Sequence, residues 1–83
     1  MTTVEAVKGI LGDALNLGER TAALRADSRL FGEMPEFDSM AVVTVLTMIE
    51  EEFAVEIHDD EISADVFQTV GTLSEFVEAK VQE

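Results

Sequence analysis

Apolar residues recur every three or four positions near the start of the chain, which predicts a first helix. The residues at this spacing are Val4, Val7, Leu11, Ala14 and Leu15. Thr2 and Glu5 have the spacing of a capping box, in which each side chain accepts a hydrogen bond from the other residue's backbone. Gly18 can adopt the left-handed backbone conformation that ends helices, so we expect the helix to end near Leu17.

Residues 18–38 show no sustained period and predict a long connection. Its apolar anchors are Leu24, Leu30 and Phe31. Gly32 and Pro35 interrupt regular structure, and Pro35 disfavours helix at Met34, so the next helix must begin beyond it. Connections of this length are usually functional or packed against the core.

A second helix is predicted from about Ser39 to Phe53, and its first turns are apolar almost all the way round. At about 100° per residue, the expected core stripe consists of Val42, Val45, Leu46, Ile49 and Phe53. The opposite face holds Met40, Thr44, Thr47, Met48 and Glu51, with Val43 and Glu50 on its flank. Flexible methionines on an exposed face are typical of a surface that docks several partners.

The last third of the chain predicts one short and one longer helix. Ile62, Val66 and Phe67 suggest a short, poorly capped helix. Thr72 and Glu75 form a second possible capping box, and the amphipathic helix that follows carries Leu73, Phe76, Val77 and Val81. Internal repeats and strand-like alternation are absent from the sequence. We therefore expect an all-α fold of three longer helices, a short third helix and a long first loop.

Charge narrows the possible partners. The 83 residues carry eighteen Asp and Glu against five Lys and Arg, a net charge of −13. Acids and bases cancel before residue 30, whereas residues 30–83 hold fourteen acids and a single base, Lys80. Such a chain repels nucleic-acid phosphates and anionic lipids, so we expect basic protein surfaces or cations as partners.

Composition also bounds the architecture and compartment. The length fits one domain over residues 1–83, and the absence of cysteine excludes disulfides and thiolate metal sites. The longest apolar stretch, residues 40–49, contains two threonines and is too short to span a bilayer. The first residues lack the pattern of a secretory leader, so we expect a cytoplasmic protein.

Two kinds of site chemistry are weighed and set aside. Ser39, His58 and Asp59 contain the residue types of a catalytic triad, but no nucleophile motif accompanies them, so we expect His58 on the surface and no catalytic residue. The carboxylates of residues 50–52 and 59–61 lack the glycine and alternation of a calcium loop. We expect a solvated acidic surface with weak divalent binding and no dedicated metal site.

The start of the second helix carries a family resemblance. The matching elements are Asp38-Ser39-Met40, then Glu50-Glu51-Glu52-Phe53 eleven residues after Ser39, then Val55-Glu56-Ile57 and an acidic turn. Together with the length, acidity, long first loop and final helix, they resemble an acyl carrier protein over nearly the whole chain. The resemblance implies an antiparallel four-helix bundle, monomeric and without catalytic activity.

The resemblance also implies roles for individual residues. Ser39 matches the serine that receives 4′-phosphopantetheine from coenzyme A, through a Mg²⁺-dependent phosphopantetheinyl transferase. Asp38 matches the preceding aspartate, and Met40 takes the place of the usual leucine beside the arm. A phosphodiester at a helix start faces free N–H groups and the positive end of the helix dipole. The arm would supply the thiol that this chain lacks.

Docking and cargo follow from the same resemblance. Acyl ligases or acyl-processing enzymes with basic patches would dock on Met40, Val43, Thr44, Thr47, Met48, Glu50, Glu51 and Glu56. Part of an acyl chain would enter a cavity lined by residues for which core packing is the alternative role: Val42, Leu46, Ile49, Ile57, Ile62, Phe67 and Leu73. Ala41 and Thr44 stand where carriers of fatty-acid synthesis bear acids, and the stretch between Ile57 and Val70 looks long. Both features indicate a specialised pathway, and residues 32–53 also resemble carriers found with exopolysaccharide and exosortase-type systems.

Two alternatives stay open at this point. The first is a peptidyl or aminoacyl carrier of the same fold. The net charge of −13 favours an acyl carrier over this alternative. The second is an interaction module that never receives the arm and uses Met40, Val43 and Met48 only as a docking face.

Overall fold

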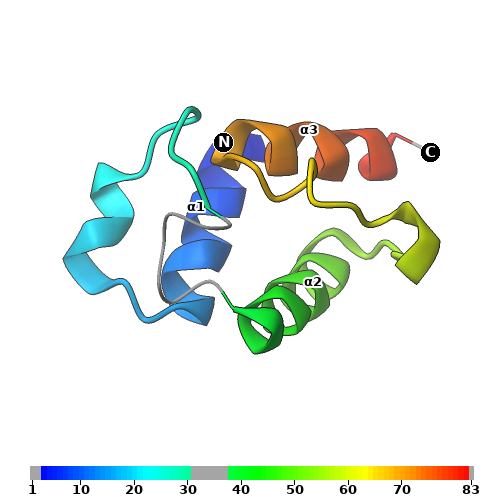
Figure 1. Cartoon of the computed structure of the whole chain (residues 1–83), viewed down its shortest axis with the longest axis horizontal. Helices are drawn as coiled ribbons and strands as arrows, with labels where there is room; N and C mark the ends of the chain where they lie inside the picture. The colour runs from blue at the N-terminus through cyan, green and yellow to red at the C-terminus, as the bar shows by residue number, and fades with distance from the viewer. Residues whose placement is uncertain (1–2, 31–37, 83) are drawn as a thin grey trace.

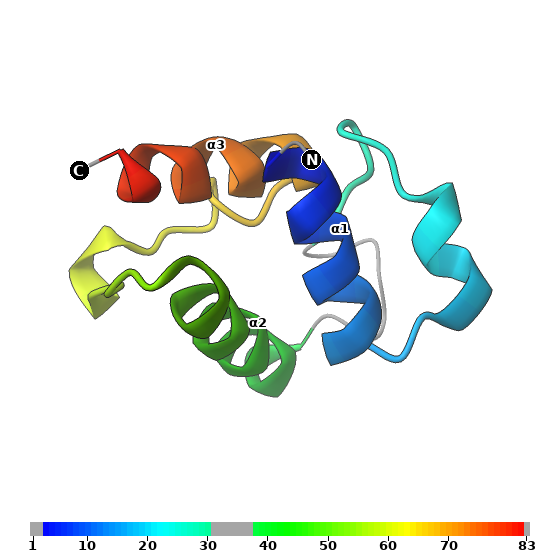
Figure 2. The same cartoon turned by 180° about the vertical axis from the view of Figure 1, so that it is seen from behind.

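The chain folds into a small helical bundle (Figures 1 and 2). The structure, a computed structural model, describes residues 3–30 and 38–82 apart from the side chain of Asp59. Its elements are α1 (Thr3–Ala14), the 3₁₀ helix η1 (Gly18–Ala23), α2 (Ser39–Phe53), the 3₁₀ turn η2 (Asp59–Glu61) and α3 (Val70–Val81). The all-α prediction is confirmed. None of the described helices is long and apolar enough to cross a membrane.

Helix α1 ends at Ala14, three residues before the end that the glycine predicted. Asn16 adopts the left-handed conformation (φ 54°), and the Leu17 N–H donates to the Gly12 carbonyl at 3.0 Å. Asparagine tolerates this conformation better than most residues, so it closes the helix before Gly18 is reached. Thr2 of the predicted capping box lies outside the described residues.

Part of the long first connection forms η1, which packs against α1. Gly12 makes this packing possible, because a Cβ at this position would clash with the side chain of Thr21. Leu24 and Leu30 are buried, as expected of anchors, whereas Phe31 lies outside the described residues.

Helix α2 has the predicted bounds, but its buried stripe is rotated from the predicted one. The buried residues are Ala41, Val45 and Ile49, whereas Val42, Leu46 and Phe53 are only half-buried. The stripe is centred about 60° away from the expected position, toward Ala41. Packing explains the shift, because α1 contacts both α2 and α3 and covers this side of α2.

Helix α3 begins two residues before the predicted capping box. Thr69 is the N-cap: its hydroxyl accepts from the Thr72 N–H at 3.1 Å, and the Thr72 hydroxyl accepts from the Thr69 N–H at 2.9 Å. The predicted pair of Thr72 with Glu75 is therefore wrong. Sequence spacing alone did not show which of the two threonines is the N-cap.

The first turn of α3 is tied to the end of the long connection. The Gly71 N–H donates to the Ala26 carbonyl at 2.7 Å, and a Cβ on Gly71 would lie 2.9 Å from that oxygen. The Val70 N–H donates to the Ser28 carbonyl at 3.0 Å, and Arg29 and Thr69 form an isolated β-bridge.

The short third helix is present only as tight turns. The Val66 N–H donates to the Ser63 carbonyl at 3.1 Å and the Phe67 N–H to the Ala64 carbonyl at 3.2 Å, both with 3₁₀-type spacing. Phe67 is buried, with an exposed fraction of 2%. This segment therefore contributes an anchor to the core without a regular helix.

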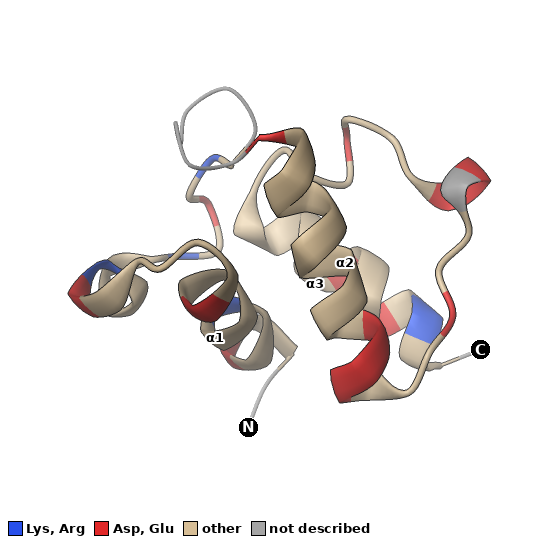
Figure 3. Cartoon of the chain, turned by 90° about the horizontal axis from the view of Figure 1, so that it is seen from below, with Lys and Arg blue, Asp and Glu red and all other residues tan. Residues whose placement is uncertain are grey.

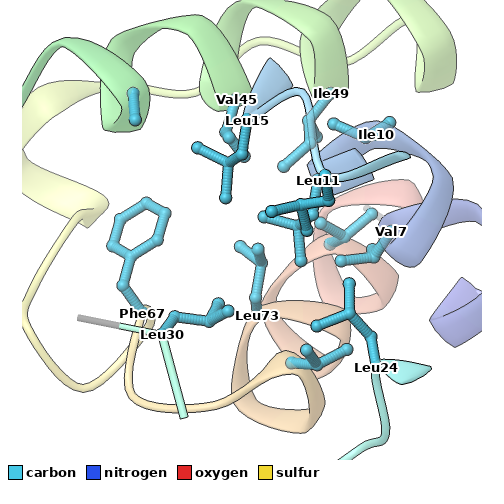
Figure 4. Close-up of a cluster of buried hydrophobic side chains, with 14 residues drawn as sticks. Val7, Ile10, Leu11, Leu15, Leu24, Leu30, Val45, Ile49, Phe67 and Leu73 are labelled. Carbon is cyan, nitrogen blue, oxygen red and sulfur yellow. The ribbon is translucent and has the colours of Figure 1, made fainter. Parts of the chain in front are cut away.

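Apolar side chains from all three α-helices and the connections meet in one core (Figure 4). Its fully buried members include Leu11 of α1, Leu30 of the first connection, Ile49 of α2 and Leu73 of α3. Helix α1 packs against α2, α3 and η1, and Ser39 stands at the exposed start of α2.

Candidate functional site

Asp38 and Ser39 form the start of α2. The Asp38 Oδ1 accepts from the Ala41 N–H at 2.9 Å, so Asp38 is the N-cap of the helix. Ser39, the first helical residue, is exposed. The N–H groups of a first turn have no acceptor within the helix, which makes this end suited to an anion.

A shallow hollow of about 370 Å³ adjoins Ser39. Its other lining residues are Val42 from α2 and Ile62, Ser63, Ala64 and Phe67 from the tight turns. The lining is mainly apolar, so the hollow suits an aliphatic chain. Among the predicted cavity residues, Ile49 and Leu73 lie instead in the packed core.

The outer face of α2 is apolar and offers few hydrogen-bond donors. Met40 and Val43 are 78% and 63% exposed. The hydroxyl of Thr44 donates to the Met40 carbonyl at 3.0 Å, and that of Thr47 donates to the Val43 carbonyl at 2.9 Å. Both threonines thus use their protons within the helix.

The comparisons with known proteins agree with this arrangement. Residues 5–78 match the protein-family model described as a phosphopantetheine attachment site. The chain is also similar to a holo acyl carrier protein from Nitrosomonas europaea whose solution NMR structure is known. The identity is 55%, the TM-score is 0.91, and the match covers 100% of both chains. The chain belongs to the acyl carrier protein family.

An acyl carrier protein carries 4′-phosphopantetheine and performs no catalysis itself. The predictions of family, cofactor and non-enzymatic function are thereby confirmed. In general terms its partners are a phosphopantetheinyl transferase and enzymes that act on the acyl group. The exposed serine, the first-turn amides and the adjoining apolar hollow fit the attachment of such an arm.

Glu50 of this acyl carrier protein has an internal partner. Its Oε2 accepts from the Ile57 N–H at 2.9 Å, seven residues later, and the side chain is half-buried. This bond holds the chain where it leaves α2 through the left-handed Ala54 (φ 55°). Glu51, by contrast, is exposed, so the two neighbouring acids face different surroundings.

Met48 lies nearer the core than the outer-face prediction placed it. It is half-buried, and it borders a second hollow between α1 and α2. Ala41 is buried, whereas Thr44, the other neutral position in the early turns, is exposed.

Acidic side chains gather toward the C-terminal end of α2 (Figure 3), whose first helical turn contains none. Glu56 and His58 follow, both exposed, with Oε1 and Nε2 3.7 Å apart. Ser39 begins α2 and His58 follows its other end. The 15 residues of α2 span about 20 Å. This arrangement does not support a catalytic triad of Ser39 with His58, and His58 is a surface residue as expected.

The described residues contain no group of three or more side chains that could hold a metal ion. Residues of the tight turns, Ser63 and Ala64, are the part of the hollow that the sequence analysis missed. They carry no periodic signal, because the segment is not a regular helix. Their position beside Ser39 arises only from the fold.

Proposed function

We propose that Ser39 is the attachment point of the 4′-phosphopantetheine arm and that the hollow beside it receives part of the acyl chain. The observation that carries this proposal is the exposed Ser39 at the start of α2, next to a hollow lined by Val42 and Phe67. When bound, the arm supplies a thiol that holds acyl groups as thioesters. The apolar lining favours an acyl over an aminoacyl cargo.

The chain's own residues present the hydroxyl and balance the charge. Asp38 fixes the first turn through its bond to Ala41, which orients Ser39 outward. The amides and dipole of that turn favour a phosphodiester on the Ser39 oxygen. Met40, 78% exposed, stands beside it as an apolar contact for the arm or for a partner.

The docking surface divides into two parts. The part close to Ser39 is an uncharged contact surface formed by Met40, Val43 and Thr47. Thr44 extends this surface, and Met48 lies at its edge. Glu51 and Glu56, at the far end, steer basic patches of partners, and the part of Glu50 in docking stays a prediction. The absence of acids from the first turn of α2 supports a specialised acyl, lipid or polysaccharide-linked pathway rather than general fatty-acid synthesis.

Residues 1–83 act as a single domain in the cytoplasm, and the net charge of −13 opposes association between copies. An acyl ligase or a chain-processing enzyme loads the arm.

The test is the intact mass of the purified protein before and after incubation with coenzyme A, Mg²⁺ and a promiscuous phosphopantetheinyl transferase. We expect a gain of one phosphopantetheine in the native protein and none in Ser39→Ala. Ser63→Ala is the matched control, because Ser63 lines the same hollow and is also exposed. It should gain the full mass.

Two outcomes contradict the proposal. Full modification of Ser39→Ala would place the arm on another residue. No modification of a correctly folded native chain would favour the alternative of an unmodified interaction module.

A further inference from the structure

A second hollow, of about 280 Å³, lies between α1 and α2. Its apolar residues include Gly9 and Ile10 of α1 and Met48 of α2, and its charged residues are Asp13, Glu51 and Glu52. Met48 and Val42 point about 120° apart around α2, so this α1–α2 groove opens on a different flank from the hollow beside Ser39.

Gly9 in this groove has no structural explanation in the fold. It is exposed in the middle of α1, its φ is not positive, and a Cβ would meet no atom within 4 Å. A glycine inside a helix lowers stability relative to alanine. Its missing side chain does, however, leave the apolar part of the groove open.

The carboxylates of the groove have no cation of their own. Among the described residues, none forms an ion pair with Asp13, Glu51 or Glu52. Nor do these three meet at a point, because the described side chains include no group that could hold a metal ion. The complementary occupant is therefore an extended cation with an apolar stem.

The charge of the chain decides among macromolecular occupants. A second copy, a nucleic acid and an anionic lipid surface are all repelled by a net charge of −13. Arginine and lysine side chains of another protein have the required form, since their methylene stems cover apolar surface while the charged head stays near solvent.

We propose that the α1–α2 groove binds a basic segment of a partner protein, with an arginine or lysine stem over Gly9 and Met48 and its head group among the three carboxylates. Met48 lies about 14 Å along the helix from Ser39. Such a contact anchors the carrier while Ser39 stays accessible. The proposal is independent of the arm.

The experiment titrates the full-length protein with a synthetic amphipathic helical peptide that carries arginine and leucine on one face, at low salt. Binding is followed by NMR, on the Gly9 amide and the Met48 methyl group. The titration is run on the protein before and after modification with coenzyme A, and both forms should bind alike. Failure of the modification therefore leaves this result intact.

Matched variants test the location. We expect the joint substitution of Glu51→Gln and Glu52→Gln to weaken binding about tenfold. The same loss of charge on α3, Glu75→Gln with Glu78→Gln, should change it less than about twofold. Gly9→Leu, which fills the groove, should also weaken binding, whereas Ala79→Leu on an exposed part of α3 should not.

A stability measurement distinguishes weaker binding caused by a filled groove from weaker binding caused by a less stable fold. Gly9→Ala should raise the melting midpoint by about 4 °C or more, because it removes the glycine penalty from α1. The same variant should bind the peptide more weakly than the native protein.

Three results would overturn the proposal. Equal weakening by the α3 charge variants would show attraction to acidity in general. Shifts centred on Met40 and Val43 would place the peptide on the outer face of α2. An absence of saturable binding would leave the groove without a basic ligand.

Discussion

The Lys80 Nζ donates to the Glu61 Oε1 at 2.7 Å and joins the last turn of α3 to η2. The Lys80 side chain is 7% exposed, and Glu61 uses its other oxygen, Oε2, to accept from the His58 N–H at 2.9 Å. Lys80 is also the one base after residue 29. The pair therefore holds the connection between α2 and α3 against the last turn of α3.

This pair predicts a pH-dependent contribution to stability. The hydrogen bond from Lys80, followed by that from the His58 amide, lowers the pKa of Glu61 below its ordinary 4.5. A lowered folded-state pKa gives stability that is present above pH 4.5 and is lost as the pH falls through the folded-state value. Glu61→Gln should melt below the native protein at pH 7, and the gap should narrow below pH 4.5.

The control for this prediction is Glu75→Gln, an exposed acid on α3. It removes the same charge without touching Lys80, so its melting difference from the native protein should not shrink in the same way. A gap for Glu61→Gln that stays constant from pH 7 to pH 3 would contradict the role of the charged pair.

Glu50 and Glu51 should differ in stability although they are neighbours. Glu50→Ala removes the acceptor of the Ile57 N–H and should cost about 1 kcal/mol in the free energy of unfolding. Glu51→Ala should stay within about 0.5 kcal/mol of the native protein. Urea unfolding measures both, and equal values would mean that the Glu50 bond contributes nothing.

Two substitutions at Asp38 distinguish its role as a helix cap from the role of its negative charge. Asp38→Ala should destabilise the protein by about 1 kcal/mol through the loss of the bond to Ala41. Asp38→Asn keeps an oxygen for the cap and should be close to native in urea unfolding. Slower modification by the transferase in Asp38→Asn would then assign the charge itself to cofactor attachment, whereas a native rate would limit Asp38 to capping.

Salt should stabilise the protein. The carboxylates between Glu50 and Asp65 repel one another, and at 0.1 M salt the Debye length is about 10 Å. Raising the salt concentration, or adding millimolar Mg²⁺ or Ca²⁺, should raise the melting temperature. A melting temperature that changes with neither addition would show that this repulsion is already relieved in the native state.

The local signals in the sequence predicted the bounds of α2 well. Pro35 predicted that α2 begins beyond it, and the helix runs from Ser39 to Phe53 as expected. The cap is made within three residues, so short-range chemistry decides it. The glycine and capping-box signals placed the C-terminal end of α1 and the start of α3 less well, because Asn16 and Thr69 compete with nearby residues for the same terminal role.

The sequence by itself determined the helical class, the acidic character and the position of Ser39 at the start of α2. These depend on composition and on contacts between close neighbours along the chain. Only the tertiary structure decided that Ala41 faces the core, that Glu50 is held by Ile57, and that Lys80 meets Glu61. Which side of a helix is buried depends on the helix that packs against it, and a partner 19 residues away is chosen by the fold rather than by spacing.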